Sequence, residues 1–247
     1  MNVLVACEYS ATVRDAFRGL GHSAWSCDLL ETECRPSLHI QGDALQAIKH
    51  GRPTDGKPWD VLIAFPPCTY LCSSGMHWTV RGKRDPQLTE DALVFVQQLL
   101  NAPVPFIALE NPTGCISTRI RKPDCTIHPW QFGHPESKTT NLWLKNLPPL
   151  VPTNVLPKPA SGFWENQCKT GSQNRLGPSA DRWKIRSKTY QGIANAMAAQ
   201  WSEFLSSAPQ TSRHATAAEN RIAPRTTSII QTALALDLTM PTSTVSM

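Results

Sequence analysis

The sequence has no long apolar run, since none approaches the roughly 18 residues that a membrane-spanning helix needs. It also opens without the basic and apolar segments of a secretory signal peptide. No two of its eight cysteines are spaced as Cys-x-x-Cys, so the pattern does not favour a thiol-disulfide oxidoreductase. We therefore expect a protein of the cytoplasm with free thiols and no membrane partner.

A zinc-binding pattern is also missing. The candidate ligands have spacings that match no common zinc motif; they are Cys115, Cys125, His128 and His134. We expect no metal. The chain has 247 residues, with 40% hydrophobic and 17% charged residues, which is typical of a globular protein. Its formal charge of +5 permits binding to a polyanion such as DNA without requiring it.

Apolar runs of strand length alternate with segments of helical spacing. We expect strands over 2–6, 22–27, 38–40, 59–65 and 104–109, and helices over 12–20, 44–49, 86–101 and 181–205. Further strands are indicated within 126–132 and 138–144. This alternation predicts an α/β fold with a doubly wound, mostly parallel sheet, in which ligands bind beyond the carboxyl ends of the strands.

Composition divides the chain into four parts. We expect a catalytic domain over 1–144, a small irregular recognition region over 145–188, and a helix over 189–205 that completes the catalytic domain. Residues 206–247 are rich in Ser, Thr, Ala and Pro, which predicts a tail without a packed core. Nothing in the sequence indicates an oligomer, and we expect a monomer.

The segment Phe65-Pro-Pro-Cys68 follows the clearest buried strand. Two prolines stiffen the loop, which suits a nucleophile that must be held accurately. A buried structural thiol is the alternative interpretation. Cys72 lies four residues further on, and we interpret it as a bystander, with a place near the Cys68 thiol as the alternative.

A second strand ends in Glu110-Asn111-Pro112, and parallel strands would bring this carboxylate to the same edge of the sheet as Cys68. A helix cap or a solvated turn is the alternative for Glu110. Together the two segments predict a thiol and a carboxyl group that face one small ring.

These two segments resemble the catalytic Pro-Cys loop and the Glu-Asn-Val signature of DNA cytosine-C5 methyltransferases. Other pieces follow in the family's order over residues 1–205, and the likeness is nearest to short bacteriophage members. The resemblance implies a Rossmann-like methyltransferase fold that uses S-adenosyl-L-methionine (SAM) and flips a cytosine out of DNA. It also implies work in the bacterial cytoplasm, where a phage enzyme would mask phage DNA from host restriction.

By this resemblance, Cys68 adds to C6 of the ring and Glu110 holds the ring at N3 and the exocyclic amine. The family's second arginine, which supports the flipped base, is replaced by Thr140, and we expect Lys138 at the position of the first arginine to substitute for it as a point charge. The resemblance assigns SAM to the first loop, to the acid after the second strand, to a Gly-Asp pair, to the Pro-Cys loop and to the last helix. The residues at those places are Cys7, Glu8, Tyr9, Ser10, Asp28, Asp43, Pro66 and Asn195.

The chain departs from the family pattern in two places. The first loop, from Ala6 to Thr12, has no glycine, so we expect Ser10 and the start of the next helix to supply donors instead. The usual Gln-x-Arg-x-Arg is replaced by Glu136, Lys138 and Thr140. These changes keep open the alternative of a binding protein of the same fold without activity, and the short recognition segment keeps open an enzyme that modifies a cytosine nucleotide.

The recognition region is short, which predicts relaxed or two-to-four-base specificity. Basic and aromatic residues such as Trp164 in this region suit contact with phosphates or a wedge between bases, whereas a solvated loop with core tryptophans is the alternative. Residues 72–83 are expected to form a mobile catalytic loop. The predicted DNA contacts are Arg81, Lys83, Arg84, Arg175, Arg182 and Lys184.

Overall fold

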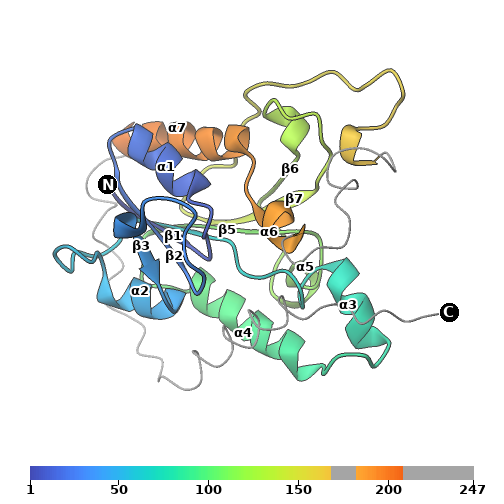
Figure 1. Cartoon of the computed structure of the whole chain (residues 1–247), viewed down its shortest axis with the longest axis horizontal. Helices are drawn as coiled ribbons and strands as arrows, with labels where there is room; N and C mark the ends of the chain where they lie inside the picture. The colour runs from blue at the N-terminus through green and yellow to red at the C-terminus, as the bar shows by residue number, and fades with distance from the viewer. Residues whose placement is uncertain (168–181, 208–247) are drawn as a thin grey trace.

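A computed structural model describes residues 1–167 and 182–207, and this part of the chain forms one seven-stranded sheet with helices on both faces (Figure 1). The spatial order of the strands is β3-β2-β1-β4-β5-β7-β6. In chain order they are β1 (Asn2–Ala6), β2 (Ser23–Asp28), β3 (His39–Gln41), β4 (Val61–Ala64), β5 (Phe106–Asn111), β6 (Cys125–Ile127) and β7 (Thr140–Lys145).

The predicted Rossmann-like α/β fold is confirmed. Strands β1 to β5 are parallel to one another, and β7 runs antiparallel to both β5 and β6, between which it lies. The chain builds outward from β1 to β3 and then returns to place β4 on the other side of β1. Ligands of such sheets bind at this reversal point, beyond the carboxyl ends of the strands.

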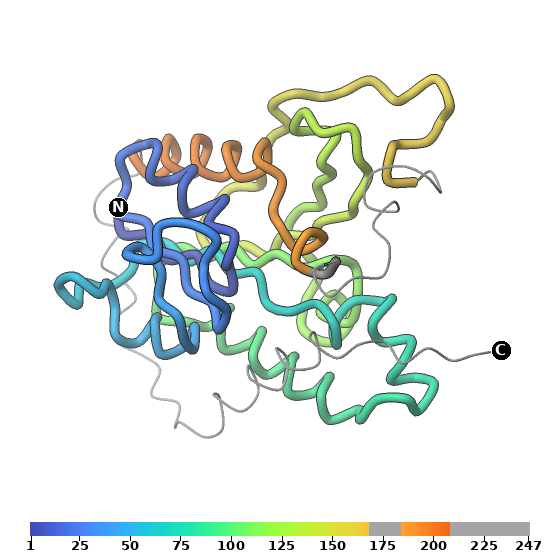
Figure 2. Tube along the Cα trace, viewed as in Figure 1, coloured from blue at the N-terminus to red at the C-terminus, as the bar shows by residue number. Residues whose placement is uncertain are grey.

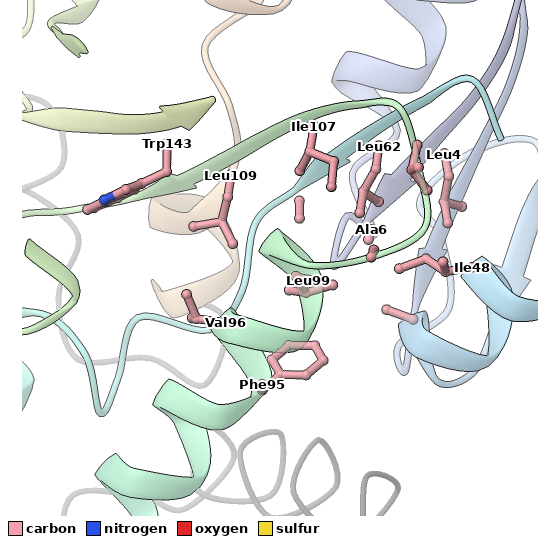
Figure 3. Packing of buried hydrophobic residues seen from close by; sticks show 14 of the residues in the cluster. Leu4, Ala6, Ile48, Leu62, Phe95, Val96, Leu99, Ile107, Leu109 and Trp143 are labelled. Atoms are coloured by element: carbon pink, nitrogen blue, oxygen red, sulfur yellow. The ribbon is translucent and has the colours of Figure 1, made fainter. Parts of the chain in front are cut away.

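The central strands are apolar throughout because both faces of the sheet are covered. Val3 and Val5 of β1 point to one face, where they join a core with helices α1 (Thr12–Gly19) and α7 (Gln191–Ser207). Leu4 and Ala6 point to the other face, with α2 (Ala44–His50) and α4 (Gln87–Leu100). Figure 3 shows this second core, in which Phe95, Val96 and Leu99 of α4 lie beneath the strands.

Helices α1 and α7 lie side by side although they are far apart in the sequence (Figure 2). The His22 ring bonds the hydroxyl of Ser202 at 2.7 Å and joins the two segments. The remaining helices are α3 (Ser73–Val80), α5 (Ile116–Arg119), α6 (Arg182–Ser187) and the short 3-10 helices η1 (Pro36–Leu38), η2 (Pro129–Gln131) and η3 (Glu165–Gln167).

One local prediction was wrong. The expected loop over 72–83 contains α3, which the sequence hides because its polar residues and a glycine give little helical pattern and none of its side chains is buried. The segment over 181–205 is helical as expected but is broken into α6 and α7, and α7 corresponds to the helix expected over 189–205. The break follows from long-range contacts: the Tyr190 hydroxyl donates to Glu136, and the Gly192 N–H donates to the His134 ring at 2.9 Å.

Parts of the predicted recognition region and of the predicted tail, including Arg175, lie outside the described residues. Within the described residues, no helix is long and apolar enough to cross a bilayer.

Candidate active site

A cleft of about 790 Å³ opens at the carboxyl ends of β1, β2, β4 and β5. It brings together predicted catalytic residues and predicted cofactor residues, namely Cys7, Tyr9, Asp28, Pro66, Cys68, Glu110 and Lys138. Its volume lies in the range of sites that hold a small molecule or cofactor. Parallel pairing of β4 with β5 explains the meeting, since Ala64 pairs with Leu109 and the two strands end at the same edge.

Cys68 lies half-buried on the loop that leaves β4. Asn111, at the end of β5, donates from Nδ2 to the Pro66 carbonyl at 2.9 Å, and this bond is buried. The neighbouring strand therefore holds the Pro-Pro-Cys loop in place, in addition to the stiffness of the prolines. The thiol faces the cleft, so the interpretation of Cys68 as a thiol packed in the interior does not fit.

Glu110 lines the same cleft, and its carboxyl group has no hydrogen-bond partner within the described residues. Burial raises the pKa of Glu110, while the nearby ammonium of Lys138 lowers it in part. A carboxyl group with a raised pKa keeps its proton more readily, so it can donate a hydrogen bond to a ring nitrogen as well as accept one.

Lys138 lies beside Cys68 and Glu110 at the cleft, ahead of β7. Its Nζ donates to the Arg186 carbonyl at 3.2 Å, which ties the start of β7 to α6. Glu136, two residues earlier, turns away from the cleft and accepts a hydrogen bond from the Tyr190 hydroxyl.

Two further cleft residues were not assigned to the site from the sequence. Cys72 lines the cleft together with Cys68, and its N–H donates to the Cys68 carbonyl at 2.9 Å, although its spacing alone indicated a bystander. Arg186 of α6 reaches the cleft from the other side. Its place among several basic residues gave a general signal, but only the fold decides which of them faces the site.

The cofactor half of the cleft is formed at the ends of β1 and β2. Asp28 lines it, accepts the Leu30 N–H at 2.9 Å, and has its pKa raised to about 6 by burial. Cys7 also lines it and takes a left-handed backbone with φ of 59°. Non-glycine residues adopt this conformation at a cost of roughly 1–2 kcal/mol, which glycine would avoid.

Asp43 adds a polar atom near this half. Its Oδ1 caps α2 by accepting the N–H groups of Leu45 and Gln46 at 2.8 and 3.0 Å. Its Oδ2 is buried and has no hydrogen-bond partner within the described residues. Because Gly42 and Ala44 on either side line the cleft, an unpartnered acceptor lies next to it.

Four predicted cofactor residues do not line the cleft, namely Asp43 and the three that follow, Glu8, Ser10 and Asn195. Glu8 is buried, and its carboxylate accepts the N–H groups of Val13 and Arg14 at 2.6 and 3.2 Å, so it occupies the donors of α1 that we expected to serve SAM. The Ser10 hydroxyl bonds Thr12 at 3.1 Å. Ser10 and Asn195 border a separate depression beside α1 and α7. The left-handed backbone of Ala11, with φ of 62°, accompanies this turn away from the cleft.

The predicted DNA contacts are spread over several places. Arg84 lines the cleft, donates to the Thr69 carbonyl at 3.3 Å and lies 5.3 Å from the centre of the Tyr70 ring. Arg81 and Lys83 are exposed outside it. Lys184 meets the site through its carbonyl, which accepts the Tyr9 hydroxyl. Arg182 begins α6.

Trp164 is part of the packed structure, because it is buried and its ring stacks on Trp130 with centroids 5.7 Å apart. The prediction of a wedge was therefore wrong for this residue, and the core alternative holds. In the described ranges, no three His, Cys, Asp or Glu side chains group as metal ligands.

Comparison with protein-family models found no match, and neither did comparison with curated proteins.

Proposed function

We propose that the chain is a SAM-dependent DNA cytosine-C5 methyltransferase. The observation that carries this proposal is the shared cleft, in which a thiol and a carboxyl group lie at one end and a buried acid lies at the other. A nucleophile, a ring-binding group and a place for a methyl donor are the parts that C5 methylation needs. Their order along the chain also agrees with the family that the sequence resembles.

In this proposal, Cys68 adds to C6 of the flipped cytosine and makes C5 nucleophilic. The protonated carboxyl of Glu110 donates to N3 and stabilises the charge that develops on the ring. Lys138 lies close enough to both groups to stabilise negative charge in the cleft. When bound, SAM supplies an electrophilic methyl group.

The residues around the other end of the cleft fit SAM. Asp28 suits the ribose hydroxyls, and Gly42 and Ala44 line the cleft on either side of Asp43, whose buried Oδ2 does not itself line it. Apolar walls from Leu29, Leu30 and Phe65 suit the adenine ring. The donors of α1 are occupied by Glu8, so the carboxylate of SAM must find its partners elsewhere in the cleft.

The test is transfer of a labelled methyl group from SAM to unmethylated duplex DNA, with mass analysis of the resulting nucleosides. We expect 5-methylcytosine with the wild-type protein, and a loss of at least about 10³-fold with Cys68→Ser, which retains SAM binding. Cys34→Ser is the matched control, because Cys34 is an exposed thiol outside the cleft.

A parallel assay with dCMP separates DNA from a free nucleotide as the substrate. Methyl transfer to an atom other than C5, equal activity of Cys68→Ser and wild type, or SAM binding without any transfer would contradict the proposal. The last result would favour a binding protein of the same fold.

A further inference from the structure

Trp78 is a large aromatic side chain that stays half exposed in the cleft. It belongs to α3, a helix with no buried side chain, and 47% of its surface is exposed. It lines the same cleft as Cys68, and its ring meets that of His77 edge-on with centroids 5.7 Å apart. Aromatic side chains that line a cleft supply much of the apolar contact with a ligand. Packing of the core does not explain Trp78, so a ligand is the better explanation.

The position of Trp78 relative to Cys68 is fixed by the way α3 lies on the catalytic loop. A Cβ on Gly75 would lie 1.9 Å from the Thr69 carbonyl oxygen, so the helix and the loop are in close contact. At the start of the helix, the Cys72 N–H donates to the Cys68 carbonyl at 2.9 Å. The indole is therefore held in place before any ligand binds, which lowers the entropic cost of binding.

The face of α3 that lines the cleft is defined by helical spacing. Ser74 and Gly75 line the cleft, and Trp78 follows them by four and three positions, so the three share one face. Four residues of helix rise by about 6 Å. Trp78 therefore lies one turn beyond the part of α3 that is next to Cys72. This place suits a second ring beside the one that Cys68 attacks.

The proposed reaction also excludes the reacting ring as the partner of Trp78. The sulfur of Cys68 approaches C6 from one face of the cytosine, and the methyl group reaches C5 from the other face. These two groups leave no face of that ring for a stacked indole. The ring that stacks on Trp78 must therefore belong to a neighbouring nucleotide.

Basic side chains beside Trp78 suit the phosphates of such a strand. Arg84 lines the cleft, follows α3 in the chain and donates to the Thr69 carbonyl at 3.3 Å. Lys138 and Arg186 line other parts of the same cleft. Proteins that bind unpaired strands combine aromatic rings on which bases stack with basic side chains along the backbone.

We propose that Trp78 stacks on the base that adjoins the reacting cytosine, so that the site takes DNA that is unpaired over both nucleotides. This inference rests on the proposed function and names its substrate more closely. In a duplex, the neighbouring base is paired and stacked, and it cannot enter the cleft until that pair opens as well. A single strand is therefore the better substrate.

Fluorescence anisotropy with a labelled single-stranded pentanucleotide tests the contact without SAM and without methyl transfer. Its central base is its only cytosine. We expect Trp78→Ala to bind about tenfold more weakly than wild type, and Trp78→Phe to retain most of the affinity because it keeps a ring. Val80→Ala is the matched control, because Val80 is 81% exposed on the same helix and does not line the cleft.

An abasic site on either side of the cytosine identifies the base that Trp78 contacts. In the wild-type protein, an abasic site at one of the two positions should weaken binding about tenfold. In Trp78→Ala the same abasic site should have little further effect, because both changes remove one contact. Wild-type affinity of Trp78→Ala for the strand, an abasic effect that is unchanged in this variant, or no binding to the strand would overturn the proposal.

The same five bases within a hairpin duplex test the class of substrate. We expect wild type and Trp78→Ala to bind the hairpin alike, since the paired neighbour is not available to the indole. An equal loss on the hairpin and on the single strand would overturn the preference for unpaired DNA.

The outcome is separate from that of the methyl-transfer assay. If Trp78→Ala shows the expected losses while the wild-type protein transfers no methyl group, the stacking site stands and the proposed methyl transfer fails. If the wild type makes 5-methylcytosine and Trp78→Ala binds and methylates the strand equally well, only the stacking role of Trp78 fails.

Discussion

Glu8 illustrates how one residue can exchange a predicted role at the cofactor for a structural role. Its side chain is buried, and its two oxygens cap the first turn of α1. Burial is the main cause that raises the pKa of Glu8 from its ordinary 4.5 to about 7, while the bonds from Val13 and Arg14 lower it in part. The residue therefore couples folding to pH.

The sign of this coupling follows from linkage. Because the folded pKa lies above the unfolded pKa, the contribution of protonated Glu8 to stability is fully present below about pH 4.5. It falls between about pH 4.5 and pH 7, by at most about 3 kcal/mol, and changes little above that. We expect Glu8→Gln to remove this slope, because the amide does not titrate.

Urea denaturation at pH 5 and pH 7.5 measures the effect. Glu31→Gln is the matched control, since Glu31 is an exposed carboxylate outside the cleft. The prediction is wrong if wild type and Glu8→Gln lose the same free energy of unfolding between the two pH values.

At the scale of the element, α3 depends on a close backbone approach. A Cβ on Gly75 would lie 1.9 Å from the Thr69 carbonyl oxygen, so only glycine lets this turn lie on the catalytic loop. We expect Gly75→Ala to lower the free energy of unfolding by about 1–3 kcal/mol, because backbone must move to make room.

Gly19→Ala is the matched control for Gly75→Ala, because a Cβ at Gly19 would meet no atom within 4 Å. It lies at the end of α1, where alanine should be neutral or stabilise by up to about 1 kcal/mol. Urea denaturation midpoints of the two variants test this prediction. Equal midpoints would mean that α3 moves away from Thr69 without lowering the free energy of unfolding.

The elements that could be predicted from sequence are those whose burial shows in their own residues, as an apolar run. Val3 to Ala6 and Val61 to Ala64 are apolar on every residue because helices cover both faces of the sheet, and such runs stand out. The contact that holds the start of α7 could not be predicted, since Gly192 packs against the distant carbonyl of Phe132 and the local pattern is helical on both sides.

For the same reason, some residues of the candidate site could be predicted from sequence and others could not. Cys68 and Glu110 could be brought together from sequence because the ends of parallel strands meet at one edge. The place of Ser10 could not be predicted, because it depends on a left-handed residue at Ala11 that no glycine marks. Nor could the spacing decide whether Cys72 lies beside Cys68 at the cleft, since it does not tell where a sulfur points.

At the scale of the whole molecule, basic side chains from separate parts of the chain meet where the proposed DNA would bind. Lys138, Arg84 and Arg186 line the cleft, on a chain of formal charge +5. Arg84 comes from the segment after α3 and Arg186 from α6, so the two approach the cleft from different parts of the chain. A flipped nucleotide carries a phosphate on each side, and arginine is well suited to hold phosphate.

Binding to a duplex should therefore weaken as salt rises, with a slope of log affinity against log salt of about −0.9 for each phosphate contact. We expect Arg84→Ala and Arg186→Ala each to reduce the size of this slope by about one, and to weaken binding to all sequences alike. Fluorescence anisotropy between 50 and 200 mM salt measures it. Lys49→Ala is the control, because Lys49 is exposed at the end of α2 outside the cleft. Lys49→Ala should keep the wild-type slope. If Arg84→Ala and Arg186→Ala keep it as well, DNA does not cross this cleft between Arg84 and Arg186.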